Sequence, residues 1–313
     1  MSTPDASSAA APLAPSHVPA SPADLGPTVD LGSRPVHRMG FGAMQLPGPG
    51  VMGPPRDRDA AVAVLRRAVE LGVDHIDTAQ YYGPDVSNEL IREALHPYPD
   101  ELALVSKVGA VRDAKGGWPP AQQPAELRAG VEDNLRTLGV EQLAAVNLRL
   151  VDRIRGYTPP PFEDQLAEMV AMRDEGLIGG IGLSNVTAEQ LETAIRLAGV
   201  VCVQNQYSLL DRAGEAVLER CTSEGIAFVP FFPLGSAFPG LPKVSEHPVV
   251  VDLADRLGAT PAQVGLAWLL HHAPTILLIP GTSSPEHLEE NVAARSLPLT
   301  EEQVAQLDAA AAA

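Results

Sequence analysis

Short apolar runs alternate along the chain with longer segments whose apolar residues recur every three or four positions. The short runs are 38–44, 75–77, 102–107, 143–149, 178–184, 201–205, 226–231 and 275–280. The longer segments include 58–72, 87–95, 125–139, 161–176 and 187–199. Runs of the first kind indicate buried strands, and the spacing of the second kind indicates amphipathic helices. The last of these helices opens on Thr187 with Gln190 three residues later, the pattern of a capping box, and several helices end in glycine.

The order of these segments predicts repeated βα units. Eight strands, each followed by a helical segment, favour an α/β fold of the (β/α)8 TIM barrel type over a doubly wound sheet, which normally has fewer units and a crossover point. Residues 1–26 are rich in Ser, Pro and Ala and lack the basic and apolar regions of a signal peptide. We therefore expect a disordered tail at 1–26 and a single barrel domain at 27–313.

Composition and charge narrow the classes of partner. The formal net charge of -17 opposes binding to nucleic acid or to an anionic membrane, and no stretch approaches the roughly 18 uninterrupted apolar residues of a membrane span. A phosphate-bearing small molecule can still bind at backbone N–H groups and helix N-termini. Cys202 and Cys221 have no CxxC or metal-ligand spacing around them, which predicts free thiols, no metal site and a cytoplasmic protein.

Ionisable and amide residues gather at the predicted strand ends, where a barrel of this type carries its chemistry. They are Asp77, Lys107, Arg149, Ser184, Asn185, Gln204, Phe231 and Gly281, with Tyr82 on the loop after Asp77. Each has an ordinary structural explanation by itself, as a helix cap, a solvated strand end or a turn residue. Their common location favours a functional site.

The residue types at these strand ends suit proton transfer to a carbonyl oxygen. A tyrosine phenol, with an ordinary pKa of about 10, needs a nearby cation before it ionises readily. Lys107 can supply that cation, and Asp77 can hold the lysine charged and oriented. Tyr82 would then protonate the carbonyl as hydride arrives from a nicotinamide cofactor. Phe231 can stack on the nicotinamide ring, and its carboxamide can bind Ser184, Asn185 and Gln204.

With these residues in place, the sequence resembles the aldo-keto reductase superfamily over nearly all of the chain after the tail. The resemblance rests on "DTAQYYG", "SNELIREAL", "VSKVG", "GLSN", "VQNQYSLLDR", "FFPLGS" and "IPGTSSPEHLEENV", in this order. It implies a (β/α)8 barrel that binds NADPH without a Rossmann domain and reduces an aldehyde or ketone, a small-molecule carbonyl substrate, to an alcohol. It also implies that Asp77, Tyr82 and Lys107 are catalytic.

The resemblance further implies a set of cofactor contacts. Ser184, Asn185 and Gln204 match the carboxamide-binding residues, and Phe231 matches a stacking aromatic that is more often tyrosine. The remaining contacts implied are Gly42, Ala43 and Met44 near the first strand, Leu234, Gly235 and Ser236 along the pyrophosphate, and Gly281, Thr282, Ser283, His287, Glu290 and Asn291 at the adenosine end.

Two departures from the family pattern affect these expectations. The fourth catalytic residue is normally a histidine, but a gap-free comparison puts Arg149 there, and a shifted one puts Asp152 there. Arginine can lower the tyrosine pKa but cannot titrate as histidine does, whereas aspartate would raise that pKa. At the 2′-phosphate end, Gly281 and His287 replace a usual lysine and arginine. We still expect NADPH, with NADH possible.

Other motifs have simpler interpretations. The segment 48–53, "GPGVMG", matches a G-x-G-x-x-G fingerprint, but two prolines follow before any helix starts, which predicts a loop at the barrel mouth. His75 is expected to be a core histidine with its hydrogen bonds satisfied. Trp118 is a candidate wall of the substrate site or a structural surface residue, and Lys243 can approach the cofactor phosphates.

Two other functions compete with carbonyl reduction. One is a non-catalytic dinucleotide-binding protein with a regulatory or redox-sensing role, suggested by the missing histidine. The other is an aldolase that forms a Schiff base on Lys107, although an aldolase has no need of the "GLSN" and "IPGTSSPEHLEEN" segments. The pattern leaves the substrate and the oligomeric state open.

Overall fold

The computed structural model describes residues 25–151, 156–235 and 242–311. The predicted tail up to residue 24 therefore lies outside the described residues, as do two predicted site candidates, Asp152 and Ser236.

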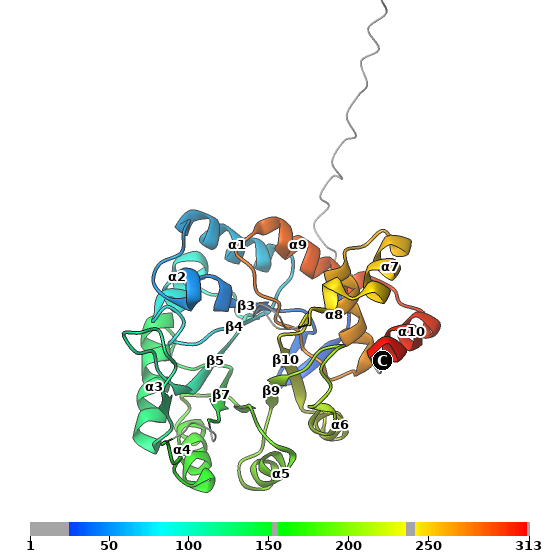
Figure 1. Ribbon diagram of the computed structural model, residues 1–313. Coiled ribbons are helices and arrows are strands. Elements are labelled where there is room, and N and C mark those ends of the chain that lie inside the picture. The colour runs from blue at the N-terminus through cyan, green and yellow to red at the C-terminus, as the bar shows by residue number, and fades with distance from the viewer. Residues whose placement is uncertain (1–24, 152–155, 236–241, 312–313) are drawn as a thin grey trace, which may run out of the picture.

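Seven short parallel strands form the centre of the molecule. They are β3 (Phe41–Gly42), β4 (His75–Asp77), β5 (Ala103–Ala110), β7 (Ala145–Arg149), β8 (Ile181–Ser184), β9 (Cys202–Gln206) and β10 (Ala227–Phe231). Each pairs in parallel with the next, in the order β3-β4-β5-β7-β8-β9-β10. Figure 1 shows these strands in the middle of the molecule with the helices around them.

The ring closes through the eighth predicted strand, segment 275–280. Ile276 forms a parallel bridge to Phe228 in β10, and Leu278 forms one to Met39, just before β3. The amide of Leu278 donates to Arg38 O at 2.9 Å, and the amide of Gly40 donates back to Leu278 O at 2.8 Å. The segment is not a regular strand, but its bridges join the two sheet edges as a (β/α)8 barrel requires.

Ten α-helices are described outside the strands. They are α1 (Arg58–Glu70), α2 (Val86–Leu95), α3 (Pro124–Leu138), α4 (Phe162–Asp174), α5 (Ala188–Leu197), α6 (Glu215–Glu224), α7 (Pro248–Leu257), α8 (Pro261–His272), α9 (Pro285–Ala293) and α10 (Glu301–Ala311). The predicted capping box at α5 is confirmed, with Thr187 accepting from the amide of Gln190. Apolar faces of these helices pack on the outward side chains of the strands, where Leu, Val, Ile and Ala predominate.

The first predicted strand, 38–44, is shorter than expected. Only Phe41 and Gly42 form β3, and Ala43–Gln45 turn into a 3-10 helix. A further two-residue strand, β6 (Pro120–Ala121), pairs antiparallel with the end of β5. Both features lie where the strands give way to loops, so the ends of the barrel are less regular than the apolar runs indicated.

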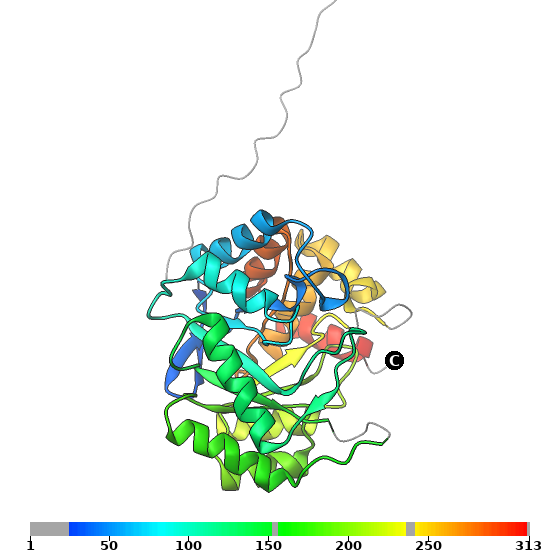
Figure 2. The same ribbon diagram turned by 90° about the vertical axis from the view of Figure 1, so that its left-hand side faces the viewer.

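An N-terminal hairpin, which the sequence pattern did not predict, covers the opposite end of the barrel. It consists of β1 (Thr28–Leu31) and β2 (Arg34–His37). Its buried residues pack against inward-facing side chains at the start of the strands, in one cluster that includes Val29, Leu31, Val36, Ala103, Val105, Ala145, Ala227, Val229 and Leu277. In Figure 2 this hairpin lies at the left edge and the loops that follow the strands lie at the right. The hairpin closes one end, which leaves the loop end for ligands.

Candidate active site

A buried ion pair lies at the loop end of the barrel. Lys107 at β5 donates through Nζ to Asp77 Oδ1 at the end of β4 and to the carbonyl of Thr78 at 3.1 Å. The side chain of Gln204 in β9 donates to the other carboxylate oxygen, Oδ2, at 2.6 Å. Lys107, Asp77 and Gln204 are only 7%, 3% and 2% exposed. The predicted support of Lys107 by Asp77 is therefore present as a direct contact.

Tyr82 lies above this pair, on the loop after β4. Lys107 Nζ is 5.1 Å from the centroid of its ring, and the tyrosine is 5% exposed. Burial raises the pKa of the Tyr82 phenol, the charge of Asp77 raises it further, and the charge of Arg149 opposes them. The sequence suggested that Lys107 would lower this pKa, but Asp77 offsets the lysine charge. The phenol is therefore held protonated, the state that a proton donor needs.

Arg149 lies at the end of β7. Of the two candidates to replace the usual catalytic histidine, Arg149 and Asp152, it is the one that lies within the described ranges. Its Nη1 is buried and has no hydrogen-bond partner within those ranges. Its backbone carbonyl accepts from Gln122 Nε2 at 3.2 Å, which fixes the end of the strand. The charge of Arg149 lowers the pKa of both Tyr81 and Tyr82 against the stronger effect of burial. The charge of Arg149 therefore acts on both phenols.

Aromatic side chains form one wall of the site. Trp118 meets Tyr81 edge to face at a centroid distance of 5.2 Å and Tyr82 at 5.9 Å. Val51 and Met44, the latter a predicted cofactor contact, pack on the same cluster. Trp118 therefore lies beside the predicted proton donor, as the wall interpretation of this residue expects.

Arg112 links this wall to the 48–53 loop. Its guanidinium lies 4.2 Å from the centroid of the Trp118 ring and donates to the carbonyls of Gly50 at 2.6 Å and Val51 at 2.9 Å. The amide of Gly53 donates to the carbonyl of Gly83 at 2.8 Å. The G-x-G-x-x-G match is thus a loop at the barrel mouth, as predicted, and sequence reasoning missed the arginine that holds it.

The predicted carboxamide-binding residues come together at the ends of β8 and β9. Ser184 and Gln204 are buried neighbours across the two strands, and Asn185 follows with φ 60° and an exposed side chain. Asn205, which the sequence analysis missed, holds the loop after β8, because its side chain donates to Val186 O at 2.8 Å and accepts from Val186 N at 3.0 Å. The sequence feature that could have identified Asn205 is its place next to Gln204 in an apolar strand, which puts a polar amide on the opposite, buried face.

The other predicted cofactor contacts continue along the same arc of strand ends, from β10 to α9. Phe231 ends β10, and Leu234 and Gly235 follow it, with Gly235 bridged to Lys243. Lys243 forms an exposed ion pair with Glu246 at 2.7 Å, so its ammonium already has an acidic partner. These residues lie on consecutive strand ends, as an extended ligand requires.

The arc ends where the eighth strand meets β3 and α9. A Cβ on Gly42 would lie 2.5 Å from the carbonyl of Ile279, and one on Gly281 would overlap the carbonyl of Gly42, so both positions need glycine. Ser284 caps α9 by accepting from the amide of His287 at 3.3 Å. The predicted contacts Thr282 and Ser283 precede the start of this helix, and His287, Glu290 and Asn291 lie within it. Ala43, another predicted contact, is buried next to Gly42. The helix N-terminus and adjacent hydroxyl groups fit a phosphate.

His75 is buried as predicted, but the expectation of satisfied hydrogen bonds is wrong. It is 1% exposed, and neither ring nitrogen has a hydrogen-bond partner in the described part of the chain. Its Nδ1 lies 3.8 Å from Asp74 Oδ1. A Cβ on Gly40 would overlap the imidazole, so the ring fills space that this glycine leaves.

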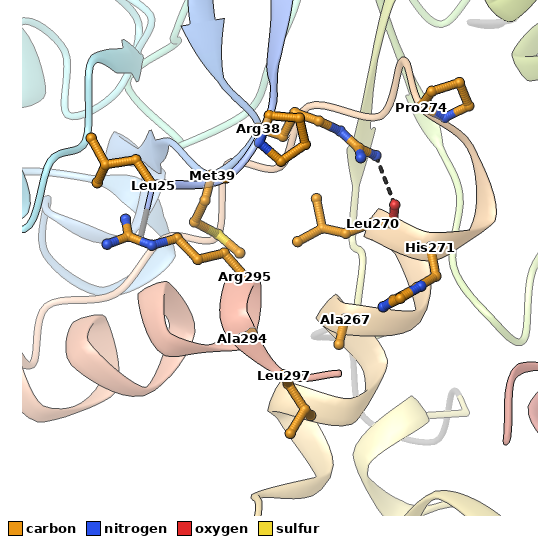
Figure 3. Close-up of a pocket in the computed structure, with 12 residues that line it drawn as sticks. Leu25, Arg38, Met39, Ala267, Leu270, His271, Pro274, Ala294, Arg295 and Leu297 are labelled. Carbon is orange, nitrogen blue, oxygen red and sulfur yellow. Dashed lines mark hydrogen bonds between the residues drawn. The ribbon is translucent and has the colours of Figure 1, made fainter. Parts of the chain in front are cut away.

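A cavity of about 410 Å³ lies at the opposite end of the barrel from these residues. Figure 3 shows it between α8 and the segment around Arg295, with Met39 and Leu270 among its lining. Arg38 does not offer it a free cation, because its guanidinium donates to the carbonyls of Leu270 and Ala273 at 2.9 and 2.5 Å. This cavity adjoins the start of the strands and is separate from the predicted site.

The described residues contain neither a cluster of metal ligands nor a membrane-spanning helix. No group of three or more His, Cys, Asp or Glu side chains there is arranged to hold a metal ion. Within the same ranges, no helix has the length and apolar character needed to cross a membrane.

Comparison with known proteins agrees with this geometry. Residues 38–312 match the model of the aldo/keto reductase family. The chain is 51% identical to pyridoxine 4-dehydrogenase of Escherichia coli over 90% of its own length and 97% of that protein. It is 43% identical to an uncharacterized oxidoreductase of Schizosaccharomyces pombe over 90% of its own length and 89% of that protein.

Solved structures agree with the fold and with the predicted cofactor. An aldo/keto reductase from Klebsiella pneumoniae in complex with NADP and acetate is 28% identical, with a TM-score of 0.75 over 90% of this chain and 94% of that one. A structure of an aldo-keto reductase from the same organism with NADPH matches at 28% identity and a TM-score of 0.76, with the same shares covered. The predicted barrel, oxidoreductase class and NADP cofactor are thereby confirmed at the level of the family. The chain belongs to the aldo/keto reductase family.

Proposed function

We propose that this protein reduces the aldehyde of pyridoxal or a closely similar aromatic aldehyde to the alcohol, with NADPH as the hydride source and Tyr82 as the proton donor. The proton-donor role is supported by one observation, a buried Tyr82 phenol that is held protonated. The centroid of its ring lies 5.1 Å from the ammonium of Lys107, which is ion-paired with Asp77. The substrate class is supported by the 51% identity to pyridoxine 4-dehydrogenase over nearly the whole of that protein.

The chain's own residues account for the proton. NADPH, when bound, supplies a hydride to the carbonyl carbon. The π electrons of the carbonyl move to its oxygen, which takes the proton from the Tyr82 hydroxyl and becomes the alcohol. The phenolate that remains is stabilised by the cation of Arg149 until solvent returns a proton.

The proposed cofactor site extends from β8 to α9. Ser184, Asn185 and Gln204, at the ends of the paired strands β8 and β9, would bind the carboxamide, and Phe231, at the end of the neighbouring β10, would stack on the nicotinamide ring. The 2′-phosphate would bind at the start of α9 with Thr282 and Ser283, and the lack of the usual lysine and arginine predicts a modest preference for NADPH over NADH.

Absorbance at the nicotinamide band tests this function directly. Purified protein is mixed with NADPH or NADH and with pyridoxal, benzaldehyde, a quinone and a diketone. Tyr82→Phe is compared with Tyr98→Phe, a matched change at a tyrosine that donates to Leu138 O on another part of the barrel. We expect wild type and Tyr98→Phe to turn over pyridoxal, and Tyr82→Phe to be at least about 100-fold slower with NADPH binding retained.

Other outcomes separate the competing functions. NADPH binding without turnover of any carbonyl compound would favour the regulatory dinucleotide-binding protein that the missing histidine suggests. Covalent trapping of a carbonyl compound on Lys107 by borohydride, with no need for NADPH, would favour the aldolase. Equal loss in the two tyrosine variants would refute the role of Tyr82.

A further inference from the structure

Two buried donors near Tyr82 have no protein partner in the described residues. They are Nη1 of Arg149 and the hydroxyl of Tyr81. A buried donor without a partner costs about 1–3 kcal/mol, so such groups are rare outside sites where a ligand pairs them. The backbone of Arg149 lies against Gly109, and Tyr81 packs in one buried cluster with Ala110, the next residue of β5, so both donors lie around the end of this strand. The charge of Arg149 also acts on the pKa of both Tyr81 and Tyr82.

Within the part of the chain that the structure describes, no carboxylate offsets the charge of Arg149. Asp77 is ion-paired with Lys107 and hydrogen-bonded to Gln204, and no carboxylate forms an ion pair with Arg149 within the described ranges. A protein with a formal net charge of -17 repels anions in general, so an unpaired cation inside its site favours a ligand with a local negative charge.

The shape of a guanidinium indicates where that negative charge would lie. A histidine offers a single donor to the substrate oxygen, whereas arginine offers a planar fork that binds two neighbouring oxygens. An aromatic aldehyde with a hydroxyl on the adjacent ring carbon presents two such oxygens along one edge. The edge-to-face wall of Tyr81 and Trp118 would pack on the ring of this substrate.

We propose that Arg149, together with Tyr81, makes the protein selective for aromatic aldehydes that carry a hydroxyl or oxyanion ortho to the carbonyl. One part of the fork binds the carbonyl oxygen beside Tyr82, and Nη1 binds the ortho oxygen. This inference rests on the proposed function, because pyridoxal has its ring hydroxyl next to the aldehyde. In this inference, Arg149 determines which aldehydes the protein reduces most efficiently.

Ratios of kcat/KM for matched substrates test the inference. The probes are 2-hydroxybenzaldehyde, 4-hydroxybenzaldehyde and benzaldehyde, each with NADPH. The para isomer donates electrons to the carbonyl much as the ortho isomer does but has its hydroxyl out of reach. For the wild type we expect an ortho-to-para preference of about 10- to 100-fold, the range of one charge-assisted hydrogen bond.

Variants assign the preference to the arginine. Arg149→Met should reduce the ortho-to-para ratio to within about twofold even where both rates fall, and Arg149→Lys should retain part of it because the charge remains. Arg66→Met is the matched control, because Arg66 is exposed on α1. Binding gives a second readout that needs no turnover, because quenching of tryptophan fluorescence yields a dissociation constant. In the wild type, 2-hydroxybenzoate should bind more tightly than 4-hydroxybenzoate, and in Arg149→Met the two dissociation constants should be similar.

Failure of the inference and failure of the proposed function give different results. If the wild type reduces none of the three aldehydes and no pyridoxal, the proposed function fails and this inference fails with it. If it reduces benzaldehyde but shows no ortho preference, or if Arg149→Met keeps the preference, the reductase function stands and the role of Arg149 is refuted.

Discussion

The effects of Asp77 and Lys107 on the free energy of unfolding should be strongly coupled, because the two groups form an ion pair and both are almost completely buried. With Asp77→Ala, the ammonium of Lys107 loses its carboxylate and keeps the carbonyl of Thr78 at 3.1 Å, and the amide of Gln204 loses its acceptor. Removal of one partner of a buried pair costs about 3–5 kcal/mol. We therefore expect Asp77→Ala and Lys107→Met each to lower the free energy of unfolding by about that amount.

The double variant makes the prediction specific to the pair. Once both charges are gone, neither Lys107 nor Asp77 leaves a buried charge without its partner, so the combined loss should fall short of the sum of the two single losses by about 2–3 kcal/mol. The exposed pair of Arg256 and Asp252, one helical turn apart at 3.1 Å, provides a matched cycle, in which we expect a coupling of at most about 0.5 kcal/mol.

Urea unfolding measures both cycles. Circular dichroism and tryptophan fluorescence are followed for each variant, and variants are compared where they share the wild-type m value, because a shared m value shows that the same surface is exposed on unfolding. If the losses at the buried pair simply add, or couple no more strongly than those at the exposed pair, the two groups do not support each other as the contact at Asp77 Oδ1 implies.

Three further predictions concern separate parts of the barrel. Burial holds the pKa of Tyr82 above its ordinary value of about 10, so its contribution to stability is complete below about pH 10 and is lost as the pH rises further. The urea midpoint should therefore fall as the pH is raised from about 10 to about 11, and less steeply in Tyr82→Phe. An equal fall in that variant would contradict the assignment. Asp74 accepts hydrogen bonds from the backbone N of His37 at 3.0 Å and from its Nδ1 at 2.6 Å. Asp74→Ala should therefore loosen the hairpin and lower the free energy of unfolding by about 1–3 kcal/mol. Faster hydrogen exchange at the His37 amide would be the local measurement. Unchanged exchange there would show that the hairpin is held by packing alone. Asn205→Ala should free the loop at Val186 and weaken NADPH binding by about tenfold in a fluorescence titration while kcat changes little, and unaltered affinity would count against this loop as part of the cofactor site.

The barrel could be predicted because most of its strands are short, mainly apolar runs between helical segments. Both faces of such a strand are covered, so its sequence carries the signal without knowledge of its neighbours. The N-terminal hairpin carries no such signal. Its strands have four residues each, and Val29, Leu31 and Val36 are buried only because they meet the inward side chains of other strands, such as Val105. That burial is a tertiary effect.

The site could be predicted in its residue types but not in its electrostatics. Asp77, Lys107 and Tyr82 were expected together because the ends of parallel strands meet at one face of a barrel. Which charge dominates at the phenol depends on contact geometry. The carboxylate binds the ammonium directly, so burial and Asp77 determine the direction of the pKa shift of Tyr82. Spacing along the chain carries no information on that balance.

The contacts of Asp77 explain how an acidic protein can hold cations in the candidate active site. Asp77 binds Lys107 and Gln204 with its two oxygens, which fixes one strand end against two others. Its charge also keeps the proton on Tyr82, so the resting phenol is a donor and not a base. Arg149 then supplies the charge that the ion pair has cancelled. Under the proposed function, its position at the end of β7 would bring that charge to the substrate oxygen, where a histidine would supply it only when protonated.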